Sequence, residues 1–210
     1  MAVIRPFECV RPQAEKAERV AALPYDVYNR EEACREVARE PLSFLKIDRA
    51  ETQFDSSVDT YAPEVYAKAK ELLENAIADG TFIKDSEQAY YIYELTMDGR
   101  VQTGLVACAS IDDYESNVIK KHENTRADKE LDRITHVDTC NAQTGPIFLA
   151  YRANAVINGE IDKAKKNSSL YNFVSPDGVR HQVWKISEPQ SVKAIRGAFE
   201  GISSIYIADG

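Results

Sequence analysis

Apolar positions recur with two different periods along this chain, and these periods divide it into helices and strands. From Ala62 to Asp79 they return every three or four residues, as on one face of a helix. Pro63 in the first turn and Gly80 just beyond the last turn are typical of helix ends. The core-facing residues are predicted to be Val65, Ala69, Leu72, Leu73 and Ala76. Further helices are predicted over residues 13–22, 30–39, 154–166 and 189–200.

Strands are indicated by β-rich runs that end at turn residues. Asp98-Gly99 lies between two such runs and is a preferred two-residue hairpin turn. Alternation along the first run predicts that either Tyr90 and Ile92, or Tyr91 and Tyr93, form the more buried pair. A second hairpin is predicted from Leu170 to Ile186, with its turn at residues 176–178. Single strands are predicted over residues 2–7, 42–47 and 203–208, and a polar surface loop over residues 50–60.

These elements predict an α+β fold with a mixed, mostly antiparallel sheet that carries two hairpins and is flanked by helices. No internal repeat or low-complexity linker interrupts them. The sequence therefore predicts a single domain over residues 1–210, expected to be the N-terminal part of a longer protein.

The stretch from Val118 to Arg152 holds two of the three histidines and many charged residues. Its apolar residues at helical spacing form one narrow stripe: Ala127, Leu131, Ile134 and Val137. The residues Arg126, Lys129, Arg133 and His136 crowd another side of the same helix. A helix of this kind either presents a solvated charged face or holds an anion, and the spacing leaves both interpretations open.

A polar turn follows this helix and leads into an apolar strand. Gly145 permits a positive φ and Pro146 removes a ladder hydrogen bond, so the chain is expected to turn there. Asn141, Gln143 and Thr144 would then lie at the mouth of the strand, where polar side chains often face a ligand. An ordinary polar turn would have the same composition.

Composition and charge exclude several classes of protein. The net charge of −8 argues against a general nucleic-acid binder, which needs a basic surface. The sequence has no apolar span of membrane length and no signal-peptide core, so a cytoplasmic protein is expected. The four cysteines are scattered without a C-x-x-C pair, which disfavours a zinc site or a disulfide framework.

Metal and nucleotide sites have characteristic residue spacings, and these are missing from the chain. His122, Glu123, Asp132 and His136 are metal-ligand types, but the two histidines are too far apart for one helix to present both to one ion. We therefore predict no metal site. Walker, Rossmann and hydrolase-elbow motifs are absent. A basic group around His122, Arg126 and Arg133 would suit a phosphate or carboxylate.

Several segments together resemble the N-terminal half of the bacterial and archaeal domain-of-unknown-function family 1015. They are I-R-P-F at residues 4–7, P-Y-D-V at 24–27, S-F-L at 43–45, L-T-M-D-G-R-x-Q-T-G-L at 95–105, K-K-H-E-N-T-R at 120–126, D-R at 132–133, N-A-Q-T-G-P at 141–146, D-G-V-R-H at 177–181 and Y-I-A-D-G at 206–210. Together these segments span the whole chain.

The resemblance implies a fold and a chemistry. Family members continue after A-D-G with His-His-Arg, and that D-G-H-H-R block is similar to the phosphate loop of the ParB/sulfiredoxin-like superfamily, which includes kinases of free serine. A ParB/sulfiredoxin-like fold with a large insertion is therefore expected. The sequence stops at Gly210, before His-His-Arg, so activity that needs those three residues is expected to be missing.

Two functions are carried forward from this resemblance. The first is a small-molecule kinase that moves a phosphoryl group from a nucleotide, ATP or ADP with Mg, to a hydroxylated metabolite such as free serine. The second is a non-catalytic nucleotide- or metabolite-binding regulatory module or a partition-protein-like factor. The expected partner is a small phosphate-bearing ligand rather than a nucleic acid or a membrane, and a homodimer stays open.

The site residues expected for the kinase fall into two groups. Asp26, Glu123 and His122 are the catalytic candidates. The candidates for binding the nucleotide are Arg126, Arg133, Asn141, Gln143, Thr144, Asp209 and Gly210. We expect His122, Arg126, Arg133, Asn141 and Gln143 to converge on one concave site, with Asp209-Gly210 emerging beside it.

Overall fold

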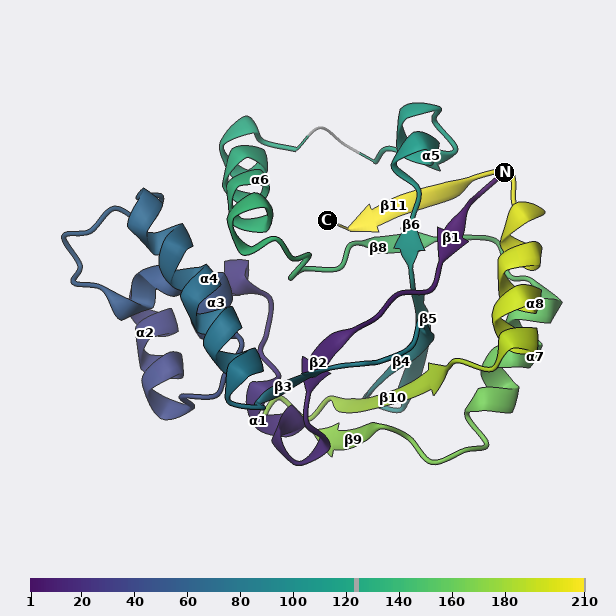
Figure 1. Cartoon of the computed structure of the whole chain (residues 1–210), viewed down its shortest axis with the longest axis horizontal. Helices are drawn as coiled ribbons and strands as arrows, with labels where there is room; N and C mark the ends of the chain where they lie inside the picture. The colour runs from purple at the N-terminus through teal and green to yellow at the C-terminus, as the bar shows by residue number, and fades with distance from the viewer. Residues whose placement is uncertain (123–124, 210) are drawn as a thin grey trace. The chain divides into compact units, whose positions relative to one another are not determined.

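The chain folds into two compact units, each with its own hydrophobic core. The computed structural model describes residues 1–122 and 125–209, and Figure 1 follows them by colour. Unit 1 comprises Met1–Val10, Lys84–Asn124 and Ile147–Gly210, whereas unit 2 comprises Arg11–Ile83 and Thr125–Pro146. The chain therefore leaves unit 1 twice to build unit 2.

An antiparallel sheet is the largest element of unit 1. Within the described residues it has four strands in the order β5-β4-β10-β9. Their bounds are β4 Tyr90–Met97, β5 Arg100–Val106, β9 Tyr171–Val174 and β10 Arg180–Ile186. Asp98 and Gly99 both have positive φ, at 51° and 79°, as a two-residue hairpin turn requires. Both predicted hairpins are therefore confirmed.

One face of this sheet forms the core of unit 1. Tyr90 and Ile92 are both fully buried, whereas in the other pair Tyr91 is buried and Tyr93 is 40% exposed, so Tyr90 and Ile92 form the more buried pair, as predicted. Two helices pack on the buried face and lie side by side in Figure 1: α7 Ala155–Ala164 and α8 Pro189–Glu200. Both helices agree with the sequence prediction.

A smaller mixed sheet in unit 1 joins three segments that are far apart in the sequence. Its order in the described chain is β7-β11-β8, with β7 Ile119–Lys120, β8 Phe148–Ala150 and β11 Ile205–Asp209. The predicted strand over residues 203–208 is confirmed as β11, which lies between its two partners. Short elements complete the unit: β1 Ile4–Arg5, β6 Cys108–Ala109 and α5 Ile111–Glu115.

Unit 2 is mainly helical. Its longest helix, α4 Pro63–Ala78, buries Val65, Ala69, Leu73 and Ala76, in agreement with the sequence prediction. Asn29 caps α2 Arg30–Arg39 in a reciprocal capping box with Glu32. The remaining helical elements are 3-10 helix η1 Ala14–Lys16, α1 Ala17–Val20, η2 Tyr25–Val27, α3 Leu45–Asp48, η3 Ala50–Gln53 and α6 Ala127–Cys140. Strands β2 Val10–Pro12 and β3 Phe82–Lys84 pair with each other.

Two predictions for the region around residue 45 are wrong. The predicted strand over residues 42–47 is instead the turn that leads into α3, where Leu45 and Ile47 are 1% exposed. A short apolar run fits a strand and a buried helical turn equally well. The predicted surface loop over residues 50–60 begins inside the fold, because Ala50 and Glu51 are buried.

Helix α6 turns its polar side inward. Leu131 and Ile134 of the apolar stripe are 65% and 58% exposed, whereas Asp132 and His136 are buried together with Cys140. Burial of a charged side chain is costly unless it is paired. The inward face of α6 must therefore have polar partners within unit 2.

The fold as a whole is α+β with mostly antiparallel sheets, as expected. The smaller sheet is mixed, because β11 runs parallel to β7 and antiparallel to β8. No helix in the described part of the chain combines the length and the apolar character needed to cross a membrane.

Candidate functional site

One edge of the smaller sheet in unit 1 gathers segments singled out by the sequence. β11 pairs in parallel with β7, with Tyr206 opposite Lys120. On its other side β11 pairs antiparallel with β8, with Asp209 opposite Phe148. The carboxyl ends of β7 and β11 and the amino end of β8 therefore meet at one edge. His122 follows β7 by two residues, and Asp209 is the last residue of β11.

Basic side chains follow β7 at this edge. Lys120 is half-buried, whereas Lys121 and His122 are exposed. The Lys121 ammonium lies 4.5 Å from the centroid of the Tyr114 ring, a cation–π contact that restrains it. Three consecutive residues that can carry positive charge thus stand beside the end of β11. Glu123 and Gly210 lie outside the described residues.

A second polar group lies inside unit 2 and centres on Asp48 at the end of α3. Burial raises the pKa of the Asp48 carboxyl, although His136, Arg133 and a hydrogen bond from Thr144 oppose that shift. Its Oδ1 is buried and has no hydrogen-bond partner within the described chain. The structure therefore brings the predicted residues Arg133 and Thr144 together, around a carboxylate that the sequence had not indicated.

His136 faces the same group and is only 3% exposed. Its Nε2 lies 3.1 Å from the carbonyl oxygen of Ile47. Since a carbonyl oxygen can only accept, Nε2 carries the hydrogen. The other ring nitrogen, Nδ1, is buried and has no partner among the residues described. Unit 2 thus holds two buried polar atoms without a hydrogen-bond partner in the described residues, Asp48 Oδ1 and His136 Nδ1.

Asp132, on the same inward face of α6 as His136, is bound by two neighbouring side chains. Its Oδ1 accepts a hydrogen bond of 2.9 Å from the Tyr66 hydroxyl, and its Oδ2 accepts one of 3.1 Å from Arg133. The Arg133 guanidinium also lies over the Tyr25 ring, 4.2 Å from its centroid. Burial and the Asp132 carboxylate raise the pKa of Tyr66, so its phenol stays protonated at neutral pH.

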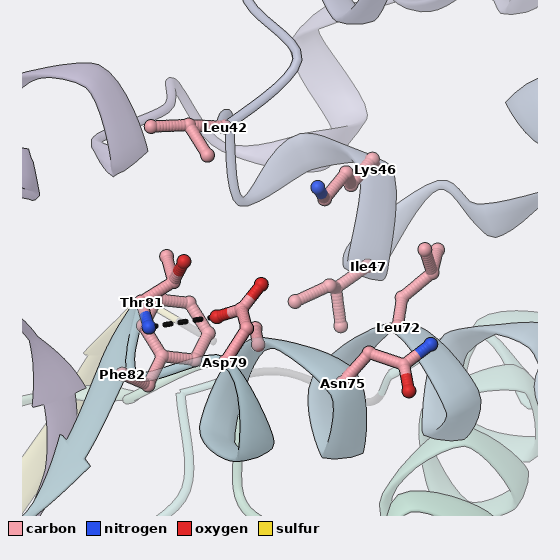
Figure 2. Close-up of a pocket in the computed structure, with 9 residues that line it drawn as sticks. Leu42, Lys46, Ile47, Leu72, Asn75, Asp79, Thr81 and Phe82 are labelled. Atoms are coloured by element: carbon pink, nitrogen blue, oxygen red, sulfur yellow. Dashed lines mark hydrogen bonds between the residues drawn. The ribbon is translucent and has the colours of Figure 1, made fainter.

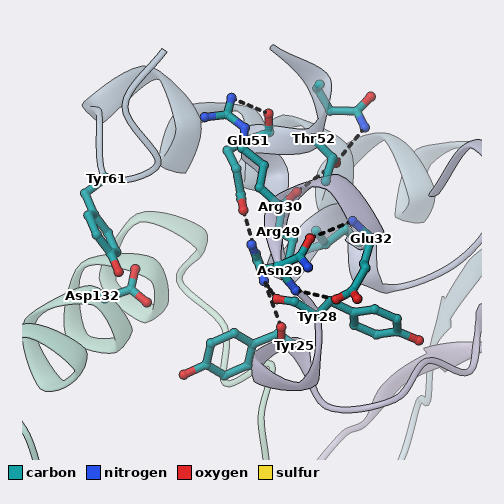
Figure 3. Close-up of polar contacts among 12 residues, drawn as sticks. Tyr25, Tyr28, Asn29, Arg30, Glu32, Arg49, Glu51, Thr52, Tyr61 and Asp132 are labelled. Atoms are coloured by element: carbon teal, nitrogen blue, oxygen red, sulfur yellow. Dashed lines mark hydrogen bonds and ion pairs between the residues drawn. The ribbon is translucent and has the colours of Figure 1, made fainter. Parts of the chain in front are cut away.

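The loop that carries Tyr25 is held by Arg49. Its Nη1 donates to the carbonyl oxygens of Tyr25 and Tyr28, at 2.9 and 2.6 Å, and its Nε lies 2.5 Å from Glu51 Oε1 (Figure 3). Glu51 is 2% exposed, so this is a buried ion pair with its hydrogen bonds satisfied. Arg49 therefore fixes the aromatic ring on which Arg133 rests.

A small cavity elsewhere in unit 2 is not a candidate site. It lies between α3 and α4, has a volume of about 70 Å³, and is lined by residues that include Lys46, Ile47 and Phe82 (Figure 2). Asp79 at its rim accepts a hydrogen bond of 2.8 Å from the Thr81 amide. A space of this size admits water but not a metabolite.

The other predicted site residues of unit 2 lie on its surface. Asp26 is exposed in η2 and Gln143 is exposed after α6. Arg126 is paired with Asp128 in the solvent, at 2.8 Å. Asn141 ends α6 in the left-handed conformation, with φ 48°. Of the predicted unit 2 residues, therefore, Arg133 and Thr144 come together at Asp48, whereas His122 and Asp209 belong to unit 1.

A comparison with protein families gives one match. The family described as Protein of unknown function (DUF1015) matches residues 4–210. The chain belongs to this family. No curated protein and no solved structure matches.

The DUF1015 resemblance had pointed to D-R at residues 132–133 but not to Asp48 or Tyr66. Asp48 lies in the stretch predicted as a strand followed by a loop, so its burial was not evident. One signal in the sequence does indicate the inward face of α6. Asp132, His136 and Cys140 are four residues apart and therefore share one face of the helix. This face is an alternative to the apolar stripe as the buried face of α6. In the described chain, no three His, Cys, Asp or Glu side chains are grouped so that they could hold a metal ion.

Proposed function

We propose that the sheet edge of unit 1 binds the phosphates of a nucleotide and that the protein transfers a phosphoryl group to a small hydroxylated metabolite. The observation that carries this proposal is the strand register. It puts Lys120, Lys121 and His122 at the end of β7 and Asp209 at the end of the parallel neighbour β11. Successive backbone amides in a turn can bind an anion, and ligands of open α/β sheets bind outside the carboxyl ends of strands.

The charges at this edge suit the reaction. Phosphoryl transfer needs positioning and charge neutralisation more than covalent chemistry from the protein. Lysine serves as a point charge for phosphate, and the N–H group of an imidazole adds a donor. The carboxylate that would accept the hydroxyl proton stays a prediction: of the two candidates, Glu123 follows β7 in the sequence, whereas Asp26 belongs to unit 2. A ParB/sulfiredoxin-like relationship of the fold is part of this proposal.

Titration calorimetry with ATP, ADP and inorganic phosphate, each with Mg, tests the binding step. For a chain in which His-His-Arg follows Gly210, as in the family members, we expect nucleotide binding that Lys121→Ala weakens about tenfold, because a charge-assisted contact to phosphate is lost. Residues 1–210 alone should bind the nucleotide weakly or not at all. Lys193→Ala is the matched control, since Lys193 is exposed on α8 and should leave the affinity unchanged. Absence of binding of all three ligands to the longer chain would refute the proposal.

Transfer is tested separately with ATP labelled at the γ-phosphate and ADP labelled at the β-phosphate. Acceptors with a free hydroxyl, such as serine, homoserine and glycerol, are offered to the protein, and labelled products are separated by chromatography. We expect label on at least one acceptor when His-His-Arg follows Gly210, and none with residues 1–210 alone. Nucleotide binding without any transfer would favour the alternative of a regulatory binding module.

A further inference from the structure

A surface groove in unit 2 lies between the amino end of α4 and one side of α6. It has a volume of about 420 Å³, which suits a small organic molecule. Tyr61, Pro63 and Tyr66 line it from the α4 side, and Asp128, Leu131, Asp132, Thr135 and Thr139 line it from α6. Its walls are partly aromatic and aliphatic because α6 turns Leu131 outward.

The charged side chains that line the groove are both carboxylates, Asp128 and Asp132. Two of the hydroxyl groups that line the groove already donate hydrogen bonds within the protein. Tyr66 donates to Asp132 at 2.9 Å, and Thr135 donates to the carbonyl oxygen of Leu131 at 2.8 Å. Only lone pairs of these hydroxyls remain for a ligand. The groove therefore favours a molecule that donates hydrogen bonds.

The ring of Tyr61 already has a positively charged neighbour in the protein, the side chain of Lys129. The Lys129 ammonium lies 6.0 Å from the centroid of the Tyr61 ring and 3.4 Å from its hydroxyl. Figure 3 shows the Tyr61 side chain extending towards Asp132. An aromatic ring near a carboxylate is a favourable setting for an ammonium group, because the ring face and the carboxylate both attract positive charge.

The arginines near the groove do not remove this preference. Arg133 contacts Oδ2 of Asp132 but rests on Tyr25 and does not line the groove. Arg126 and Asp128 are 76% and 53% exposed, so water screens their ion pair. Both carboxylates keep lone pairs for a further donor.

We propose that this groove binds a small molecule with a protonated amine on a short hydrocarbon body. The ammonium group points to Asp132 and Asp128, and the hydrocarbon lies against Leu131 and the tyrosine rings. This proposal stands apart from the phosphate site of unit 1 and is tested without nucleotide.

Titration calorimetry with three ligands of similar size tests this proposal: n-butylammonium, n-butanol and butyrate. We expect n-butylammonium to bind with a Kd of about a millimolar, as befits a ligand of this size, and the other two to bind at least tenfold more weakly. Equal binding of n-butanol or butyrate, or no binding of n-butylammonium, would overturn the proposal.

Two variants locate the site. Tyr61→Leu and Asp128→Asn alter exposed side chains, so both should fold, and each should weaken n-butylammonium binding roughly twofold to fivefold. Tyr114→Leu is the matched control, because Tyr114 is also an exposed tyrosine beside a lysine, but in unit 1. Unchanged binding by Tyr61→Leu, or an equal loss in Tyr114→Leu, would contradict the assignment.

Discussion

Asp48 and His136 each keep one buried polar atom, Oδ1 and Nδ1, for which the described residues supply no hydrogen-bond partner. Burial disfavours the charged form of a carboxyl group. It therefore raises the pKa of Asp48, so that the protonated form is more favourable in the folded protein than in the unfolded chain.

This shift has a defined sign for stability. The folded state binds the Asp48 proton more tightly than the unfolded state, so the contribution of this group is fully present below the unfolded pKa of about 3.9. It is lost as the pH rises through the higher pKa of the folded state. Unlike a carboxylate with a lowered pKa, Asp48 therefore makes the protein less stable at neutral pH.

We expect Asp48→Asn to raise the free energy of unfolding by about 1 kcal/mol at pH 7, because the amide is neutral and brings a hydrogen-bond donor. The gain should disappear as the pH falls towards 4, where Asp48 of the native protein is also protonated. Urea unfolding at a series of pH values measures both effects. Asp26→Asn, at an exposed position of unit 2, is the control. A loss of stability at pH 7 would mean that the ionised carboxylate is stabilising.

At the scale of the element, contacts between residues close in the sequence explain why some helices and turns were predicted correctly. The Asp98-Gly99 hairpin and the capping box of α2 depend on residues within a few positions of one another. The Asn29 side chain accepts a hydrogen bond of 3.0 Å from the Glu32 amide, and Glu32 accepts one of 2.9 Å from the Asn29 amide. Such signals can be predicted without knowledge of the tertiary fold.

Asn29→Ala should lower the free energy of unfolding by about 1 kcal/mol, because the backbone amide of Glu32 in the first turn of α2 loses its hydrogen-bond acceptor. Urea unfolding followed by circular dichroism measures the change. Asn158→Ala is the matched control, because Asn158 is exposed inside α7, where alanine favours the helix. Equal losses in the two variants would show that the cap is not responsible.

Which face of α6 is buried could not be predicted in the same way. From the sequence of the helix alone, its narrow apolar stripe would be expected to face the core, and Asp132 and His136 would be expected to face the solvent. Tertiary contacts turn this face inward: Tyr66 of α4 donates to Asp132, and the carbonyl oxygen of Ile47 in α3 accepts from His136. The same holds for Asp48, whose role depends on partners from distant parts of the sequence.

At the scale of the whole molecule, the two units carry separate reporters of their folding. Trp184, the single tryptophan of the sequence, is 6% exposed in the core of unit 1. Cys140 is 8% exposed in the core of unit 2, and burial raises the pKa of its thiol, which makes it slow to react in the folded state.

We expect Asn29→Ala to shift the urea midpoint of Cys140 alkylation downwards and to leave the midpoint of Trp184 fluorescence in place, because the cap belongs to unit 2. Peptide mapping identifies the alkylated cysteine. Equal shifts of both midpoints would show that the units unfold as one cooperative block.

The place of β11 between β7 and β8 has a consequence for synthesis on the ribosome. The strands β7 and β8 pair with β11 and are not neighbours of each other, so their sheet cannot assemble until residues 205–209 have emerged. Ile205 also belongs to the core of unit 1. The last residue of unit 2, in contrast, is Pro146. We therefore expect unit 2 to be able to fold before β11 has emerged, so that the proposed phosphate site forms after unit 2.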